Sequence, residues 1–136
     1  MGEPERLDLD DLALRFEAIG QEDWDTAAEL LDPDVAWHDP PDLPDATVYR
    51  GVAAVRRMWA EEMFDAWERW SLDLKELIPA GDKILSHCRM HAKAKHTGIE
   101  QDLDLFQVWT FRIGRVIEQR SFFDRSQANK AAGLGD

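Results

Sequence analysis

The first third of the chain carries apolar residues at helical spacing. They recur every three or four positions, at Leu9, Leu12, Phe16 and Ile19. This spacing places them on one helix face and predicts a helix over residues 7–20. Asp23 is expected to cap a short second helix, which Asp32-Pro33-Asp34 ends. Gly51 is expected to open a third helix, whose buried stripe is Val52, Val55, Trp59, Met63 and Trp67.

From Trp70 onward the pattern changes to a period of two, which is typical of half-buried strands. Turn residues divide this part into strands, which we expect at residues 83–95, 101–112 and 115–124. A short helix over residues 125–132 should end at Gly133. Three helices followed by a long meander predict one α+β domain over residues 1–136, in which helices cover one face of a curved, mainly antiparallel sheet.

A short strand before this meander carries the first candidate for chemistry. In Val35-Ala36-Trp37-His38-Asp39 the side chains alternate, so Asp39 continues the apolar face of Val35 and Trp37, and His38 faces the other way. A carboxylate at the end of an apolar row could act as a general base. The alternative is that Asp39, which precedes Pro40, only opens a turn.

The amino-acid composition argues against some classes of binding partner. The formal net charge is −12, and residues 1–45 hold fifteen acidic against two basic residues. We therefore expect no nucleic-acid partner, because an acidic surface repels phosphate. The sequence contains no apolar run of membrane-spanning length and no basic-apolar leader, and Cys88 is its one cysteine, so we expect a cytoplasmic protein that does not bind membranes.

With this order of elements, the chain resembles the SnoaL-like (polyketide cyclase-like) branch of the nuclear transport factor two-like superfamily. The matching stretches are residues 24–35, 37–40, 49–55, 108–116 and 124–125. The resemblance implies a cone-shaped α+β barrel with a deep pocket for a small apolar molecule, and it also implies a homodimer.

Ketosteroid isomerases of the same superfamily allow a comparison at single residues. Their catalytic base matches Asp39 in Trp37-His38-Asp39-Pro40. The two positions that hold the substrate oxygen in those enzymes correspond to Phe16 and Gln107, so one donor is lost and the other is an amide. The polyketide cyclases use a late-strand carboxylate, for which Asp124 and Glu118 are candidates. Asp124 could instead be the N-cap of the last helix.

The Ile113-Gly114 hairpin predicts which side chains share the pocket. If Phe111 pairs with Val116, then Trp109 pairs with Glu118 and Gln107 pairs with Arg120. On this register the predicted pocket surface is Leu105, Gln107, Trp109, Glu118, Arg120, Phe122 and Asp124. The alternative is a solvated face with an exposed Glu118–Arg120 charge pair, since a slip of one residue would reverse every assignment.

A second strand face carries His87, Arg89 and His91. The two histidines, four residues apart on a strand, are about 13 Å apart and cannot share one metal directly. We therefore interpret this face as solvated or dimer-facing, and we expect neither a metal nor a cofactor.

The leading hypothesis is a cofactor-independent enzyme of the isomerase, cyclase or lyase type, which moves a proton next to a carbonyl of an apolar cyclic molecule. Asp39, Gln107 and Asp124 are its predicted catalytic residues. The predicted substrate-binding residues are Phe16, Trp37, Trp109, Glu118, Arg120 and Phe122. The alternative is a non-catalytic binding or dimeric interaction module of the same fold, which the loss of a tyrosine donor at Phe16 would favour.

Overall fold

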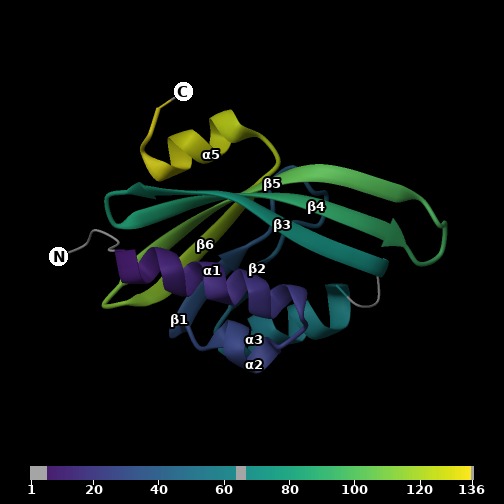
Figure 1. The fold of residues 1–136 in the computed structure, drawn as a ribbon, viewed down its shortest axis with the longest axis horizontal. Helices are drawn as coiled ribbons and strands as arrows, with labels where there is room; N and C mark the ends of the chain where they lie inside the picture. Colours follow the sequence, from purple (N-terminus) through teal and green to yellow (C-terminus); the bar gives the residue numbers. More distant parts are fainter. Residues whose placement is uncertain (1–5, 64–66, 136) are drawn as a thin grey trace.

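The computed structural model describes residues 6–63 and 67–135. In this part of the chain a mixed α+β architecture places helices on both sides of one six-stranded sheet (Figure 1). The helices are α1 (Arg6–Gly20), α2 (Trp24–Ala28), α3 (Val52–Arg57), the π-helix η1 (Met58–Met63) and α5 (Arg125–Ala132). The strands are β1 (Leu31–His38), β2 (Val48–Arg50), β3 (Trp67–Ala80), β4 (Lys83–Ala94), β5 (Glu100–Arg112) and β6 (Arg115–Phe122).

The sheet has the order β2-β1-β6-β5-β4-β3. Only the pair β1–β6 is parallel, and the other described pairs are antiparallel. The expected fold class, three N-terminal helices on a mainly antiparallel sheet, is therefore confirmed. β1 pairs with β6 across the long stretch of chain between them, which brings the end of the apolar strand beside the last strand.

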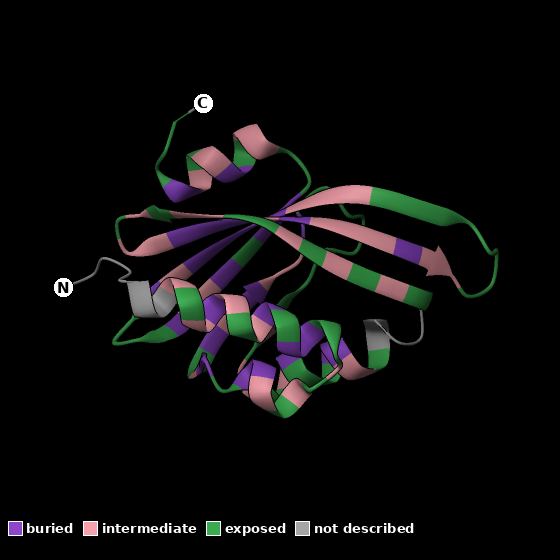
Figure 2. Ribbon diagram, in the orientation of Figure 1, coloured by how far each residue is buried: buried purple, intermediate pink, exposed green. Residues whose placement is uncertain are grey.

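Two apolar clusters lie on opposite faces of the sheet. The larger one joins α1, α2, α3 and η1 to the concave face and includes Leu12, Phe16, Trp37, Trp59 and Trp109. The smaller one lies under α5 and includes Leu85, Phe106, Val108 and Phe122. Figure 2 shows buried residues where the strands cross between the two helical layers, whereas the outer end of the β4–β5 hairpin is more exposed. Side chains on the concave face therefore contact the layer formed by α1, α2, α3 and η1.

Several predicted boundaries are confirmed at single residues. Asp23 caps α2, because its carboxylate accepts a hydrogen bond from the Thr26 N–H at 3.3 Å. α5 spans the predicted residues and ends at Gly133, whose φ of 79° is left-handed. Ile113 and Gly114 have φ values of 52° and 74°, as a two-residue hairpin of type I′ requires.

The second and third helices differ from the prediction at their ends. Leu31 and Asp32-Pro33-Asp34 belong to β1 and not to the second helix. The β1–β6 register shifts between Leu31 and Ala36, and this irregular stretch tolerates Pro33, which has no N–H for a sheet hydrogen bond. The third helix becomes a π-helix at Met58. Trp67, predicted on its buried stripe, instead begins β3, and the side chain of Met63 lies outside the described residues.

Within the described residues, no helix is long and apolar enough to span a bilayer. The one cysteine, Cys88, is fully buried on the concave face. Burial raises the pKa of its thiol to about 12, so the thiol stays protonated and behaves as a small apolar side chain.

Candidate functional site

A cavity of about 480 Å³ lies between the concave face of the sheet, α1 and η1. Thirteen of its lining residues are apolar: Phe16, Ile19, Trp37, Pro40, Leu43, Met58, Trp59, Trp67, Leu72, Met90, Leu103, Leu105 and Phe123. Four are polar: Asp39, Gln101, Gln107 and Ser121. An apolar cavity of this size with a few polar groups is typical of a small-molecule site.

Asp39 lies directly after β1 and lines the cavity. Its backbone N–H donates to the Thr47 carbonyl at 3.0 Å, which closes the loop over residues 40–46. Its carboxylate accepts hydrogen bonds from the Thr47 N–H at 3.2 Å and from the Tyr49 hydroxyl at 3.4 Å. Pairing between Trp37 and Tyr49 sets the position of β2. The short strand β2 thus holds the carboxylate at the cavity wall.

Aromatic rings form one wall of the cavity and its backing. Trp37 contacts Trp59 and Trp109 edge-on, with ring centroids 5.5 and 5.3 Å apart, and Phe16 contacts Trp109 at 5.5 Å. Phe16 and Trp37 line the cavity, whereas the buried Trp109 does not. The Trp109 indole N–H donates to the Ser86 hydroxyl at 2.8 Å. These edge-to-face contacts make the wall rigid.

Gln107 and Ser121 lie directly opposite each other on β5 and β6, and both are nearly buried. The parallel register pairs His38 with Arg120, so the next position along each strand brings Asp39 alongside Ser121. The three polar side chains therefore form one row across three neighbouring strands. The Gln107 side chain lines the cavity, and the Gln119 amide donates to the Ser121 hydroxyl at 2.5 Å.

Sequence reasoning missed Ser121 because the hairpin register changes after its first pairs. Phe111 pairs with Val116 as predicted, but Thr110, and not Trp109, pairs with Glu118. Ile117 is the extra residue of a β-bulge, and such a bulge shifts every later pair by one position. No signal in the sequence marks Ile117 as an inserted residue.

The bulge moves three predicted substrate-binding residues to the opposite face of the sheet, so their placement in the pocket was wrong. The Oε2 atom of Glu118 lies 3.2 Å from Nε2 of the His38 ring. Arg120 lies over the ring of Phe122, 5.3 Å from its centroid, and Phe122 belongs to the cluster under α5. Glu118, Arg120 and Phe122 are therefore not among the described residues that line the cavity.

Asp124 does not line the cavity either. It is exposed, and its carboxylate accepts a hydrogen bond from the Ser126 N–H at 3.1 Å, which caps α5. The predicted placement of this carboxylate in the pocket was wrong, and the alternative, an N-cap, is what the structure contains. Asp39 is then the one carboxylate among the described residues that line the cavity.

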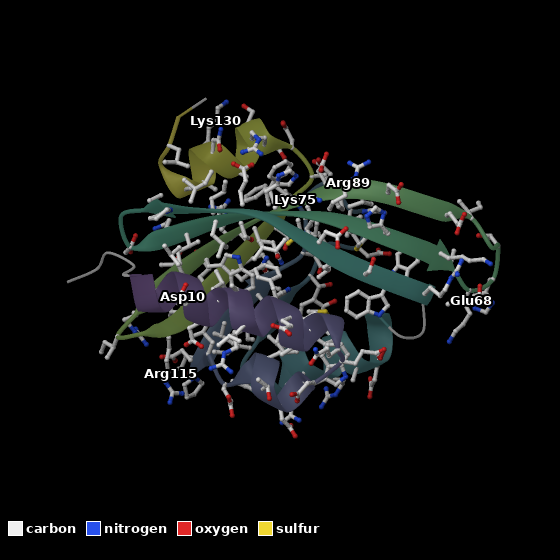
Figure 3. All side chains as sticks on the ribbon, in the orientation of Figure 1. Asp10, Glu68, Lys75, Arg89, Arg115 and Lys130 are labelled. Carbon is white, nitrogen blue, oxygen red and sulfur yellow. The ribbon has the colours of Figure 1, made fainter. Side chains whose placement is uncertain are left out.

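The convex face of β3, β4 and β5 carries a network of charges. His87 contacts Glu76 at 3.3 Å and Asp104 at 2.8 Å, and His91 contacts Asp102 at 2.5 Å and Asp73 at 3.2 Å. Arg89, labelled in Figure 3 on the side of the sheet that carries α5, pairs with Asp104 at 3.1 Å. No group of three or more possible metal ligands is found in residues 6–63 and 67–135.

These contacts shift the pKa values of the exposed groups. The hydrogen bond to Asp102 is the main cause that raises the pKa of His91. The hydrogen bond from Arg125 lowers the pKa of Glu76, and the hydrogen bond from His87 lowers the pKa of Asp104. All of these groups lie on the opposite face from the cavity.

The sequence matches a known family of proteins. The family model of the SnoaL-like domain matches residues 14–119, and the chain belongs to this family. Comparison with curated proteins finds no significant match.

Similar solved structures share the fold at low sequence identity. An NTF2-like protein of unknown function from Burkholderia pseudomallei is 21% identical, with a TM-score of 0.78 over 90% of this chain and 95% of that one. A candidate SnoaL-like polyketide cyclase from Jannaschia sp. CCS1 is 18% identical, with a TM-score of 0.74 over 95% and 92%. TerC, crystallised with polyporic acid, is 18% identical, with a TM-score of 0.74 over 93% and 98%.

Proposed function

We propose that this protein is an enzyme that transfers a proton next to a carbonyl group of an apolar, cyclic small molecule. The observation that carries the proposal is Asp39, the one carboxylate among the described residues that line an otherwise mostly apolar cavity. Hydrogen bonds from Thr47 and Tyr49 hold this carboxylate in place before any ligand binds. A general base must be positioned in this way to reach a carbon-bound proton.

In the proposed reaction Asp39 takes a proton from the carbon next to the carbonyl, and the bonding electrons move onto the carbonyl oxygen. The amide of Gln107, which lines the cavity, donates a hydrogen bond to this oxygen. Asp39 then returns the proton to another carbon of the same molecule, which is isomerisation. Alternatively, the enolate carbon attacks a second carbonyl of the same molecule, which forms a carbon–carbon bond and an alkoxide. Asp39 then returns its proton to the alkoxide oxygen, and the result is cyclisation.

The cavity supports an apolar ring system as the substrate. Its volume of about 480 Å³ and its wall of Phe16, Trp37 and Trp59 suit a flat polycyclic ligand. The similarity to a candidate polyketide cyclase and to TerC with polyporic acid agrees with a ligand that carries rings and carbonyl or hydroxyl groups.

The test is a titration with 2-naphthol, followed by the intrinsic fluorescence of the tryptophans. Naphtholate imitates the enolate, and the Asp39 carboxylate should repel it. We therefore expect Asp39→Asn to bind naphtholate roughly tenfold more tightly than the wild type, a change that one neighbouring charge can cause. Asp42→Asn removes an exposed carboxylate from the same loop outside the cavity and should leave the affinity unchanged.

Equal affinities of the wild type and Asp39→Asn would contradict the role of Asp39 and favour a non-catalytic binding module. Failure of both proteins to bind would contradict the proposed ligand class. The homodimer implied by the resemblance stays a prediction, which the mass of the protein in solution decides.

A further inference from the structure

We propose that Ser121 is a second hydrogen-bond donor to the substrate oxygen, and that Gln119 is the positioning residue that directs its hydroxyl into the cavity. This inference rests on the proposed function, because it concerns the oxygen next to the carbon from which Asp39 takes the proton. The register of the sheet places this donor beside Asp39.

The order of the side chains across the sheet places Ser121 next to Asp39. β6 lies between β1 and β5, so Ser121 lies between Asp39 and Gln107 in the polar row. Neighbouring strands are about 4.8 Å apart. Asp39 is therefore one strand from Ser121 and two strands, on the order of 10 Å, from Gln107.

The geometry of a carbonyl substrate brings its oxygen close to Ser121. A carbonyl oxygen is only two bonds from the carbon that loses the proton. With this carbon at Asp39, the oxygen comes close to Ser121 and meets Gln107 from its other side. Two donors that converge on one oxygen stabilise developing negative charge better than one, as oxyanion holes in other enzymes do.

A hydrogen bond between Gln119 and Ser121 orients the serine hydroxyl. The Gln119 side chain is fully buried, and its Nε2 donates to the Ser121 Oγ at 2.5 Å. Because the Ser121 oxygen accepts here, its own proton is left to donate elsewhere, and Ser121 lines the cavity.

The unfavourable feature of this arrangement is at the other end of the Gln119 amide. The Gln119 Oε1 is buried without a partner among the described residues. The reverse orientation would bury an N–H₂ group without a partner, and buried N–H groups without partners are rarer in proteins than such carbonyl oxygens. Because the unpartnered atom is a carbonyl oxygen and not an amino group, this comparison favours the orientation in which Ser121 is a donor.

The experiment measures the preference for an anionic ligand in the Asp39→Asn background, in which repulsion by the carboxylate is absent. The probes are 2-naphthol at a pH at which it is ionised and 2-methylnaphthalene, which has the same shape and no donor or acceptor. The preference is the ratio of the two affinities. We expect Ser121→Ala to lower this ratio about tenfold, as loss of a hydrogen bond to a charged group does.

Two further substitutions separate a donor from a merely structural residue. Ser121→Thr keeps a hydroxyl and should keep the preference. Ser86→Ala is the matched control, since Ser86 is a buried serine in the same row on β4 that bonds to Trp109 but does not line the cavity. It should weaken stability without changing the preference for naphtholate.

Gln119→Met removes the donor to Ser121 while keeping a side chain of similar length. The Ser121 hydroxyl can then rotate, and we expect the preference to fall several-fold, by less than in Ser121→Ala. An unchanged preference in Ser121→Ala would overturn the proposal that Ser121 is a donor. A fall in Ser121→Ala with no change in Gln119→Met would overturn the positioning role of Gln119.

These outcomes are independent of the test of the proposed function. The proposed function fails if Asp39→Asn does not tighten naphtholate binding relative to the wild type. The inference about Ser121 fails if the ratio of naphtholate to 2-methylnaphthalene affinity does not respond to Ser121→Ala in the Asp39→Asn protein.

Discussion

Single residues in this protein adopt conformations that their neighbours impose. Ile113 has a φ of 52° in the β5–β6 turn, and its side chain is 96% exposed. A β-branched residue is strained in the left-handed region, and this exposed side chain gains almost nothing from packing. The strain at Ile113 is therefore not offset locally, and the rest of the hairpin maintains it.

Replacement of this residue should stabilise the protein. Asn tolerates the left-handed conformation, and Asn-Gly is a preferred sequence for a two-residue hairpin. We expect Ile113→Asn to raise the free energy of unfolding by about 1 kcal/mol. Urea unfolding measures this change, and Arg112→Asn, one residue earlier at the exposed strand end, is the control. A loss of stability in Ile113→Asn would contradict the assigned turn.

Asp39 and Ser121 differ in how far the sequence alone could identify them. Asp39 follows Val35 and Trp37 at a period of two, and strand alternation alone predicts its face. Ser121 follows a β-bulge at Ile117, and the bulge depends on pairing with β5 and β1. A local pattern could not predict the face of Ser121, since the bulge reverses that pattern.

At the scale of elements, α5 depends on Asp124. The Asp124 carboxylate caps the helix, Arg125 lies over the Phe106 ring at 4.9 Å, and Ala128 and Ala132 are buried against the sheet. Cap and packing together attach α5 to the convex face, so Asp124 has a structural role that accounts for its position.

Asp124→Ala separates this role from the predicted catalytic one. Loss of the cap should lower the free energy of unfolding by about 1 kcal/mol, and Asp124→Asn should retain most of the stability because Asn is also a good N-cap. Binding of 2-naphthol should be the same in all three proteins. A large loss of affinity in Asp124→Ala, without a loss of stability, would restore Asp124 as a site residue. Urea unfolding and fluorescence titration provide the two measurements.

The helices illustrate how much of each element local sequence could predict. α1 and α5 were predicted closely because their periodicity and terminal residues are local signals. The end of the third helix was not predicted. Met58 and Trp59 belong to a π-helix beside the cavity, and Trp67 pairs with Ala94 in the sheet. Strand pairing there outweighs helical spacing.

At the scale of the whole molecule, the two faces of the sheet differ in their content of charged side chains. The concave face bears a mostly apolar cavity, and the convex face bears histidines and arginines paired with carboxylates. Stability should therefore depend on pH through the convex face. These groups are exposed, so each effect should be small and weaken as salt is added.

The pKa shifts of three of these groups determine whether stability rises or falls with pH. The raised pKa of His91 means that its contribution to stability is complete below its unfolded value of about 6.5 and is lost as the pH rises through its folded value. The lowered pKa values of Glu76 and Asp104 contribute stability above about pH 5, which is lost as the pH falls through their folded values. These three groups together favour a maximum between about pH 5 and 6.5.

The measurement is the urea midpoint of the wild type and His91→Gln between pH 6 and 9. We expect the wild type to lose more stability than His91→Gln over this range, because only the wild type has the imidazolium contacts to lose. His96→Gln, in the exposed turn between β4 and β5, is the control and should behave like the wild type. Parallel curves for wild type and His91→Gln would contradict the assigned contacts.

The sequence by itself determined the α+β class, most helix ends, the hairpin turn and the position of Asp39. These features depend on residues close together in the chain, whose spacing and capping chemistry act locally. Only the tertiary structure decided which face of β6 meets the cavity. It moved Glu118, Arg120 and Phe122 to the convex face, assigned Asp124 to the cap of α5, and placed Ser121 between Asp39 and Gln107. The physical reason is that a single bulge, formed by contacts between distant strands, reverses the side-chain alternation of all residues that follow it.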